Sequence, residues 1–136
     1  MNKEQAIYFA AQFKGVVSQE EIDAAISLNC SDTLAWFLAC SFGVRSTQIS
    51  RVLAETIYGQ LPNDCGVWIF ALKDGRYCLG EGTILEDQDV EFEERNIEVT
   101  YAETPEACLH GPLLYDPGGV VRAGLKTSFM HNALGL

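Results

Sequence analysis

Apolar residues in the N-terminal part of the chain recur at helical spacing. They repeat every three or four positions over residues 3–14, which predicts a first helix. Ser18 and Glu21 have the spacing of a capping box, and the apolar positions that follow predict a second helix to about Leu28. Ser31 or Asp32 is predicted to cap a third helix over residues 33–42, which is apolar on nearly every side, as is typical of a buried helix.

A fourth helix is predicted from Ser46 to Tyr58, with Gly59 as its stop. The apolar face of that helix would consist of residues that lie mostly three or four positions apart: Ile49, Val52, Leu53, Thr56 and Ile57. This spacing indicates an amphipathic helix that packs its apolar face on the rest of the protein.

Beyond residue 62 the pattern changes to short apolar runs that are typical of strands. Residues 67–72 and 76–79 flank Asp74-Gly75, and Asp-Gly between two such runs is the strongest short signal for a hairpin. Residues 91–101 alternate polar and apolar side chains with one shift, which predicts a further strand with a bulge or turn. Prolines and glycines then punctuate the chain, so only short strands are expected after it, at Leu113–Tyr115 and Val120–Val121.

These patterns predict an α+β fold in a single domain that spans residues 1–136. An N-terminal bundle of three to four helices, at about residues 1–60, would pack on a C-terminal antiparallel β-meander at about residues 65–136. Hydrophobic residues make up 48% of the chain, which is enough for a core that needs no metal or disulfide.

The chain is strongly acidic, with 19 Asp and Glu against 9 Lys and Arg and a formal net charge of −10. Nonspecific binding to nucleic acid or to anionic membranes depends on Lys and Arg, so this balance argues against both. No apolar run approaches the roughly 20 residues of a spanning helix, and no signal-peptide pattern opens the chain. We therefore expect a cytoplasmic protein that does not bind membranes.

The acidity is concentrated between residues 81 and 106, which hold ten acids and one base, Arg95. Acids at alternate positions of a strand share one face, which either serves solubility or complements a basic partner. Our leading hypothesis is a basic protein partner, bound in the manner of an inhibitor, immunity protein or chaperone of bacterial or phage style. The predicted binding residues are Glu86, Asp87, Asp89, Glu91, Glu93, Glu94 and Glu98.

Residues 35–54 form a second candidate site. The spacing of Ala39, Gly43, Ile49 and Val52 resembles the helix-turn-helix of bacterial repressors, with Gly43 in the tight turn between the helices. The resemblance implies a DNA-binding regulator whose second helix contacts bases and phosphates. The alternative is a helix–glycine–helix corner packed in the core. The predicted DNA contacts are Arg45, Gln48 and Arg51.

A third candidate site combines Cys65, His110 and Asp116. Their order, cysteine then histidine then acid, superficially resembles the papain-like thiol hydrolases, which implies a thiolate activated by a neighbouring imidazole. Those enzymes generally place the cysteine at the start of a helix, whereas Cys65 precedes an apolar run that predicts a strand. The alternative is a buried or turn cysteine together with a loop histidine.

No metal and no cofactor are predicted. The five cysteines include no CxxC pair, and with only two histidines the chain has no recognisable zinc motif. The glycines lack the spacing of a phosphate-binding loop. Without a secretion signal, the cysteines are expected to be reduced thiols.

Overall fold

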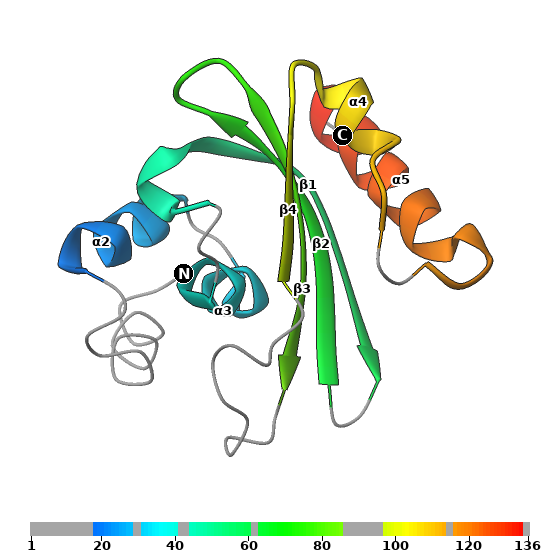
Figure 1. Cartoon of the computed structure of the whole chain (residues 1–136), viewed down its shortest axis with the longest axis horizontal. Helices are drawn as coiled ribbons and strands as arrows, with labels where there is room; N and C mark the ends of the chain where they lie inside the picture. Colours follow the sequence, from blue (N-terminus) through cyan, green and yellow to red (C-terminus); the bar gives the residue numbers. More distant parts are fainter. Residues whose placement is uncertain are drawn as a thin grey trace.

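The protein has three layers, with a central antiparallel sheet between two layers of helices (Figure 1). Helices α2 (Gln19–Leu28) and α3 (Asp32–Cys40) lie on one face of the sheet, and α4 (Pro105–Leu109) and α5 (Val120–Leu134) lie on the other. The computed structural model describes residues 18–28, 31–40, 44–60, 63–85, 97–113 and 116–134.

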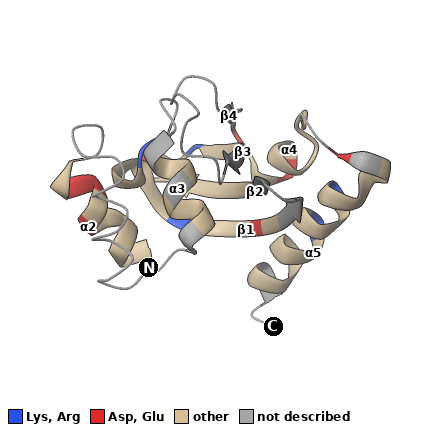
Figure 2. Ribbon diagram, turned by 90° about the horizontal axis from the view of Figure 1, so that it is seen from below, with Lys and Arg blue, Asp and Glu red and all other residues tan. Residues whose placement is uncertain are grey.

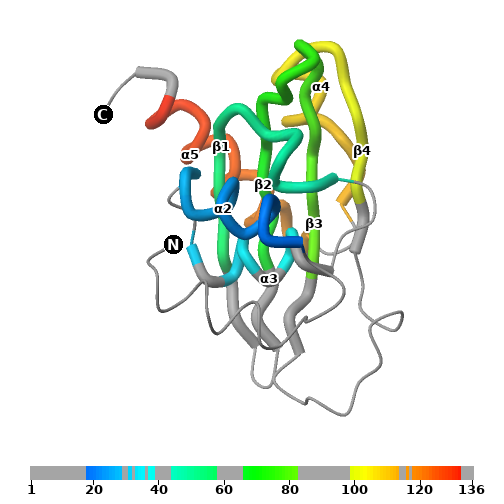
Figure 3. The backbone as a smooth tube through the Cα atoms, turned by 90° about the vertical axis from the view of Figure 1, so that its left-hand side faces the viewer, coloured from blue at the N-terminus to red at the C-terminus, as the bar shows by residue number. Residues whose placement is uncertain are grey.

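The sheet is a meander in which each strand pairs with the next one along the chain (Figure 3). Its four strands, in spatial order, are β1 (Ile49–Gln60), β2 (Asn63–Leu72), β3 (Tyr77–Leu85) and β4 (Ile97–Ala102). Antiparallel neighbours need only short connections, so this order follows directly from the succession of strands in the sequence.

The hairpin between β2 and β3 turns at Asp74 and Gly75, which confirms the prediction from the Asp-Gly pair. Gly75 has a φ of +90°, a conformation that residues with a Cβ rarely adopt. The carboxylate of Asp74 accepts a hydrogen bond from the backbone N–H of Arg76 at 3.0 Å. An Asp side chain that bonds the backbone two residues later is a common way to fix a turn.

The helices before the sheet begin where the sequence predicts their caps. Ser18 Oγ accepts a hydrogen bond from the N–H of Glu21 at 3.2 Å, and α2 ends at Leu28 as expected. Ser31 Oγ accepts from the N–H of Leu34 at 3.1 Å and so caps α3. Each cap satisfies one of the N–H groups that have no partner in the first turn of a helix. The predicted helix at 3–14 lies outside the described residues.

The first core lies between these two helices and the sheet. Trp68 and Phe70 of β2 and Phe37 of α3 are among its largest fully buried side chains. The Phe37 ring lies directly over β3, where a Cβ added to Gly80 or to Gly82 would come within 2.6 Å of a Phe37 ring carbon. The absence of side chains at these two positions therefore makes room for Phe37 and lets α3 lie close to the sheet.

A carboxylate of β1 links α3 to the sheet. Glu55 Oε2 accepts hydrogen bonds from the hydroxyl of Ser31 and from the indole N–H of Trp68, both at 2.8 Å. Ser31 in turn caps α3, so the chain Leu34–Ser31–Glu55–Trp68 connects the helix start to two strands. Partly buried polar groups are stable when they are hydrogen-bonded in this way.

The second core lies on the opposite face, between the sheet and the helices that follow it. Its buried members are Leu53, Ala54, Val67, Ile69, Leu79, Cys108, Val121 and Leu125. The short 3-10 turn η3 (Pro117–Gly119) leads into α5, which at 15 residues is the longest described helix. Among the described helices, none combines the length and the apolar composition that crossing a membrane requires.

The α+β class is confirmed, but the predicted arrangement is wrong. An N-terminal bundle of helices does not pack on a C-terminal β-meander; the sheet occupies the middle of the chain, from residue 49 to 102, and helices cover both of its faces. The predicted helix from Ser46 to Tyr58 is instead the single 3-10 turn η1 (Ser46–Gln48) followed by β1. The short strand expected at Val120–Val121 is the first turn of α5.

Two β-bulges explain why β1 has helical spacing in the sequence. The pairing with β2 shifts between Ile49 and Arg51 and again between Val52 and Ala54, so that β1 has an extra residue at each place. In a regular strand, residues three apart point to opposite faces. Here Ile49 and Val52 pack against the same core, and the neighbours Leu53 and Ala54 both belong to the other core.

Candidate functional site

A cleft of about 560 Å³ opens beside the β2–β3 hairpin, on the face of the sheet that α4 and α5 cover. Its walls come from parts of the chain that are far apart in sequence: the start of β1, the hairpin, Pro105 of α4 and the C-terminal half of α5. The volume lies within the range of about 300–1,000 Å³ that is typical of small-molecule sites.

The floor of the cleft is apolar and partly aromatic. Leu53 is buried, and Ala71, Tyr77 and Phe129 are half-buried against the second core. Because these side chains are packed on one side, the cleft surface that they form is fixed in place. A fixed apolar surface suits the hydrophobic body of a ligand.

The bulges of β1 shape one wall of the cleft. The first bulge places Ser50 beside Ala71, whose carbonyl accepts a hydrogen bond from the Ser50 hydroxyl at 3.1 Å. The same bulge directs the exposed side chain of Arg51 to the cleft wall. Bulges commonly re-aim a side chain at the edge of a sheet and beside functional sites.

Arg76 also lines the cleft, and an acidic and an aromatic side chain contact it. Its guanidinium forms an ion pair with Asp74 at 2.9 Å and lies 4.6 Å from the ring centroid of Tyr101. The side-chain hydrogen bond between Arg76 and Asp74 lowers the pKa of that carboxyl and raises the pKa of the guanidinium, and Glu103 contributes to the second shift. Arg76 is thus oriented, and its charge is compensated.

Helix α5 is joined to the outer edge of β1 next to the cleft. Asn132 donates its side-chain N–H to the carbonyl of Leu53 at 2.8 Å, and Ser128 Oγ accepts from the N–H of Glu55 at 2.9 Å. These two side chains lie one turn apart on α5. They satisfy edge groups of β1 that would otherwise be open to pairing with another strand.

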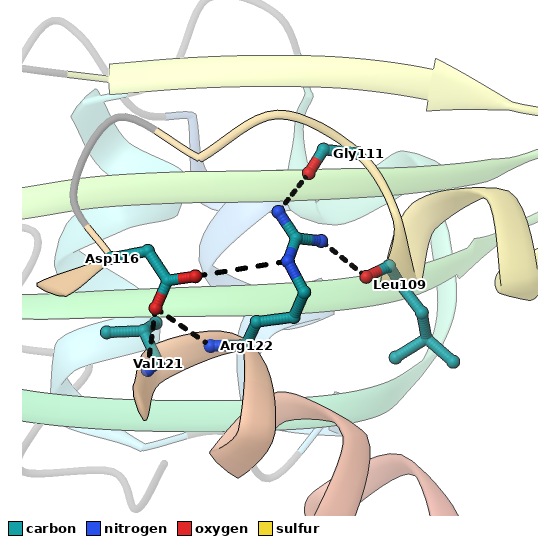
Figure 4. Close-up of polar contacts among 5 residues, drawn as sticks. All are labelled: Leu109, Gly111, Asp116, Val121 and Arg122. Carbon is teal, nitrogen blue, oxygen red and sulfur yellow. Dashed lines mark hydrogen bonds and ion pairs between the residues drawn. The ribbon is translucent and has the colours of Figure 1, made fainter. Parts of the chain in front are cut away.

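Arg122 fixes the relation between α4 and α5 (Figure 4). Its guanidinium donates hydrogen bonds to the carbonyls of Leu109 and Gly111, the latter at 2.7 Å, and lies 3.9 Å from the carboxylate of Asp116. The planar guanidinium suits such a fork of acceptors. The two helices that flank the cleft are therefore connected by one side chain.

The residues predicted to contact DNA lie at the η1 turn and at the start of β1. Arg45 is half-buried and pairs with Glu21 of α2 at 3.8 Å, and the Gln48 side chain accepts from the backbone N–H of Arg45 at 2.8 Å. Arg51 lies in β1 and lines the cleft. The second helix that the helix-turn-helix resemblance requires is absent, because residues 49–60 are a strand.

The predicted thiol-hydrolase residues come from three parts of the fold: strand β2, the end of α4 and the loop before α5. Cys65 lies in β2, where its backbone pairs with Tyr58 and Thr83, and its side chain is outside the described set. His110 is exposed at the end of α4. The carboxylate of Asp116 accepts from the N–H groups of Val121 and Arg122, so it caps α5. The proposed catalytic role of these residues stays a prediction.

The two cysteines whose side chains the structure describes are buried, and burial raises the pKa of their thiols. The pKa of Cys78 rises to about 12 and that of Cys108 to about 11, because desolvation disfavours the thiolate. Both belong to the cores of the protein. Such thiols behave as small apolar side chains rather than as nucleophiles.

Most of the predicted acidic surface lies outside the described residues. This applies to Glu86, Asp87, Asp89, Glu91, Glu93 and Glu94; Glu98 lies in β4 opposite Glu81, with its side chain outside the described set. The acids whose side chains are described are spread over α2, β1, the hairpin, β3, the segment between β4 and α4, α4 itself and the loop before α5 (Figure 2). The partner-binding role of the acidic segment stays a prediction.

Sequence reasoning missed the cleft. Its residues come from several segments, and among them only Arg51 had been predicted as a binding residue, for a different role. Asn132 and Phe129 belong to a helix that the sequence did not predict. The one available signal was the presence of two arginines, Arg51 and Arg76, in an otherwise acidic protein.

No group of three or more His, Cys, Asp or Glu side chains that could hold a metal ion is found among the described residues. We found no family model, no curated protein and no solved structure that matches this chain significantly. Its function is therefore argued from the geometry of the site alone.

Proposed function

We propose that this protein is a ligand-binding domain and that the cleft between α4, α5 and the β2–β3 hairpin holds a small organic molecule. The observation that carries the proposal is a cleft of about 560 Å³ in which apolar side chains such as Leu53 and Phe129 lie beside the polar side chains of Ser50, Arg51, Arg76 and Asn132. In a small-molecule site, apolar groups supply affinity for the body of a ligand and polar groups fix its orientation.

The chemistry of the walls supports binding rather than catalysis. The described lining includes two guanidinium groups, one amide and hydroxyl groups, but no carboxylate, imidazole or thiol. Ser50 donates its hydroxyl to a backbone carbonyl, and Asn132 donates its amide to another. General-base and nucleophilic catalysis need a group that accepts a proton near neutral pH, and the described walls offer none.

The proposal can be tested by nuclear magnetic resonance on the full chain. A library of small aromatic and aliphatic acids, amides, amines and alcohols is titrated into labelled protein, and we expect hits to shift the backbone signals of Leu53, Ala71 and Tyr77. Ala71→Phe should abolish these shifts by filling the floor of the cleft. Ala123→Phe, at an exposed position of α5 outside the lining, is the matched control. A library without hits at the cleft would contradict the proposal.

A protein-binding role for the acidic segment is our second candidate, supported by the concentration of acids before β4. Residues 86–94 hold six Asp and Glu and no Lys or Arg, and the chain leads from them through Arg95 and Asn96 into β4. A basic partner would be steered to such a segment. Reversing the charges of Glu91, Glu93 and Glu94 should abolish pull-down of that partner, while reversing Glu20, Glu21 and Asp23 of α2 should not.

A further inference from the structure

The charges around the cleft are not equivalent. Arg76 is paired with Asp74 at 2.9 Å and also interacts with Glu103, so its corner carries no excess of positive charge. Arg51, which also lines the cleft, is exposed, and the described residues provide no ion-pair partner for it. Among the described residues of the cleft, the Arg51 guanidinium can therefore pair with a ligand, whereas the Arg76 guanidinium already pairs with Asp74.

We propose that the ligand is a monocarboxylate with an aromatic or branched aliphatic body, and that Arg51 binds its carboxylate. This inference rests on the proposed function, and it names the chemical class of the ligand. A guanidinium presents two parallel N–H groups that match the two oxygens of a carboxylate, and such charge-assisted bonds are about twice as strong as neutral ones. The apolar body would then lie on Leu53, Tyr77 and Phe129.

A single available guanidinium sets the charge of the ligand. A phosphate monoester carries nearly two negative charges near neutral pH, and the second charge would find only the compensated Arg76. Asp74, Glu103 and the net charge of −10 oppose any anion that is not directly paired. A monoanion therefore fits the cleft better than a dianion.

Arg76 has a positioning role in this arrangement. Its guanidinium contacts Asp74 and the ring of Tyr101, and its side chain lines the cleft together with Tyr77 and Pro105. Replacing Arg76 should weaken all ligands that fill the cleft to a similar extent. Replacing Arg51 should weaken only the charged ones.

The test compares three matched probes on the full chain by calorimetry and resonance mapping: 3-phenylpropionate, its neutral amide and 2-phenylethyl phosphate. We expect the carboxylate to bind at least about tenfold more tightly than the amide and more tightly than the phosphate. Arg51→Gln should remove the preference for the carboxylate, and Arg76→Gln should leave it. The preference should also shrink when the salt concentration rises, since Arg51 is exposed.

The outcomes separate this inference from the proposed function. If the amide and the carboxylate shift the cleft signals equally, the cleft binds ligands but Arg51 does not select a carboxylate. If the phosphate binds most tightly, the monoanion assignment is wrong. If none of the three probes shifts a cleft signal while other library compounds do, the ligand class alone is wrong; if no compound does, both proposals fail.

Discussion

Asn132 of α5 donates its side-chain N–H to the main-chain carbonyl of Leu53 in β1, at 2.8 Å. One turn earlier, Ser128 accepts from the N–H of Glu55 at 2.9 Å. A helix thereby serves as the neighbour that an edge strand lacks. Both contacts lie beside the cleft, so the residues that protect the sheet edge also help to position a cleft wall.

Asn132→Ala and Ser128→Ala should each lower the free energy of unfolding by about 1 kcal/mol, because each removes a partner from a partly buried backbone group. Hydrogen exchange at the Glu55 amide should accelerate most in Ser128→Ala. Thr127→Ala is a suitable control, since Thr127 bonds only within α5, to the carbonyl of Ala123. Equal effects at all three positions would contradict the edge-capping role.

Gly82→Ala should destabilise the protein by about 1–3 kcal/mol, because the new Cβ would lie 2.6 Å from Phe37 and force the core to shift. The double variant Gly82→Ala, Phe37→Leu tests the cause in chemical denaturation. Relief of the clash should make the two changes less than additive. Strict additivity would show that Phe37 is not the source of the cost.

Arg122→Gln should lower stability by about 1.5–3 kcal/mol, the range for hydrogen bonds to a charged group. The loss arises at the carbonyls of Leu109 and Gly111, which Arg122 bridges. Arg122→Lys should recover only part of it, because an ammonium lacks the planar fork. Lys126→Gln, on the exposed side of the same helix, should change stability by less than about 0.5 kcal/mol.

Stability should fall as the pH rises above 9. Cys78 and Cys108 ionise near their ordinary value of 9.0 in the unfolded chain but only near 12 and 11 in the folded protein. Between these values the unfolded state binds fewer protons than the native state, so alkaline pH favours unfolding. Denaturation of a Cys78→Ala, Cys108→Ala variant should show a shallower decline from pH 9 to 11 than the parent protein. Identical slopes would contradict the burial of these thiols.

Local signals predicted local structure well. Ser18 and Ser31 cap helices as their spacing suggests, and Asp74-Gly75 forms the expected hairpin. The prediction from the sequence was wrong where bulges in the strand pairing change the spacing of residues that share one face of the sheet. In β1 the first bulge places Ile49 and Val52 on one face, which gives a strand the three-residue spacing of a helix.

The C-terminal helix was missed for a related reason. Val120 and Val121 are β-branched, and Gly118 and Gly119 precede them, so the segment looks like a turn before a strand. The cleft was beyond prediction because it needs that helix in place. Arg51 and Asn132 become neighbours of one cavity only after α5 has packed on β1.

The order of the strands has a consequence for synthesis of the protein. Each strand pairs with the one made just before it, so the sheet can assemble step by step as the chain emerges from the ribosome. Helix α5 is made after all four strands. Until α5 docks, Asn132 and Ser128 do not bond the Leu53 carbonyl and the Glu55 amide. Two nascent chains that are translated from the same mRNA can then pair through these groups. We therefore expect the interval between β4 and α5 to be the aggregation-sensitive stage of biogenesis.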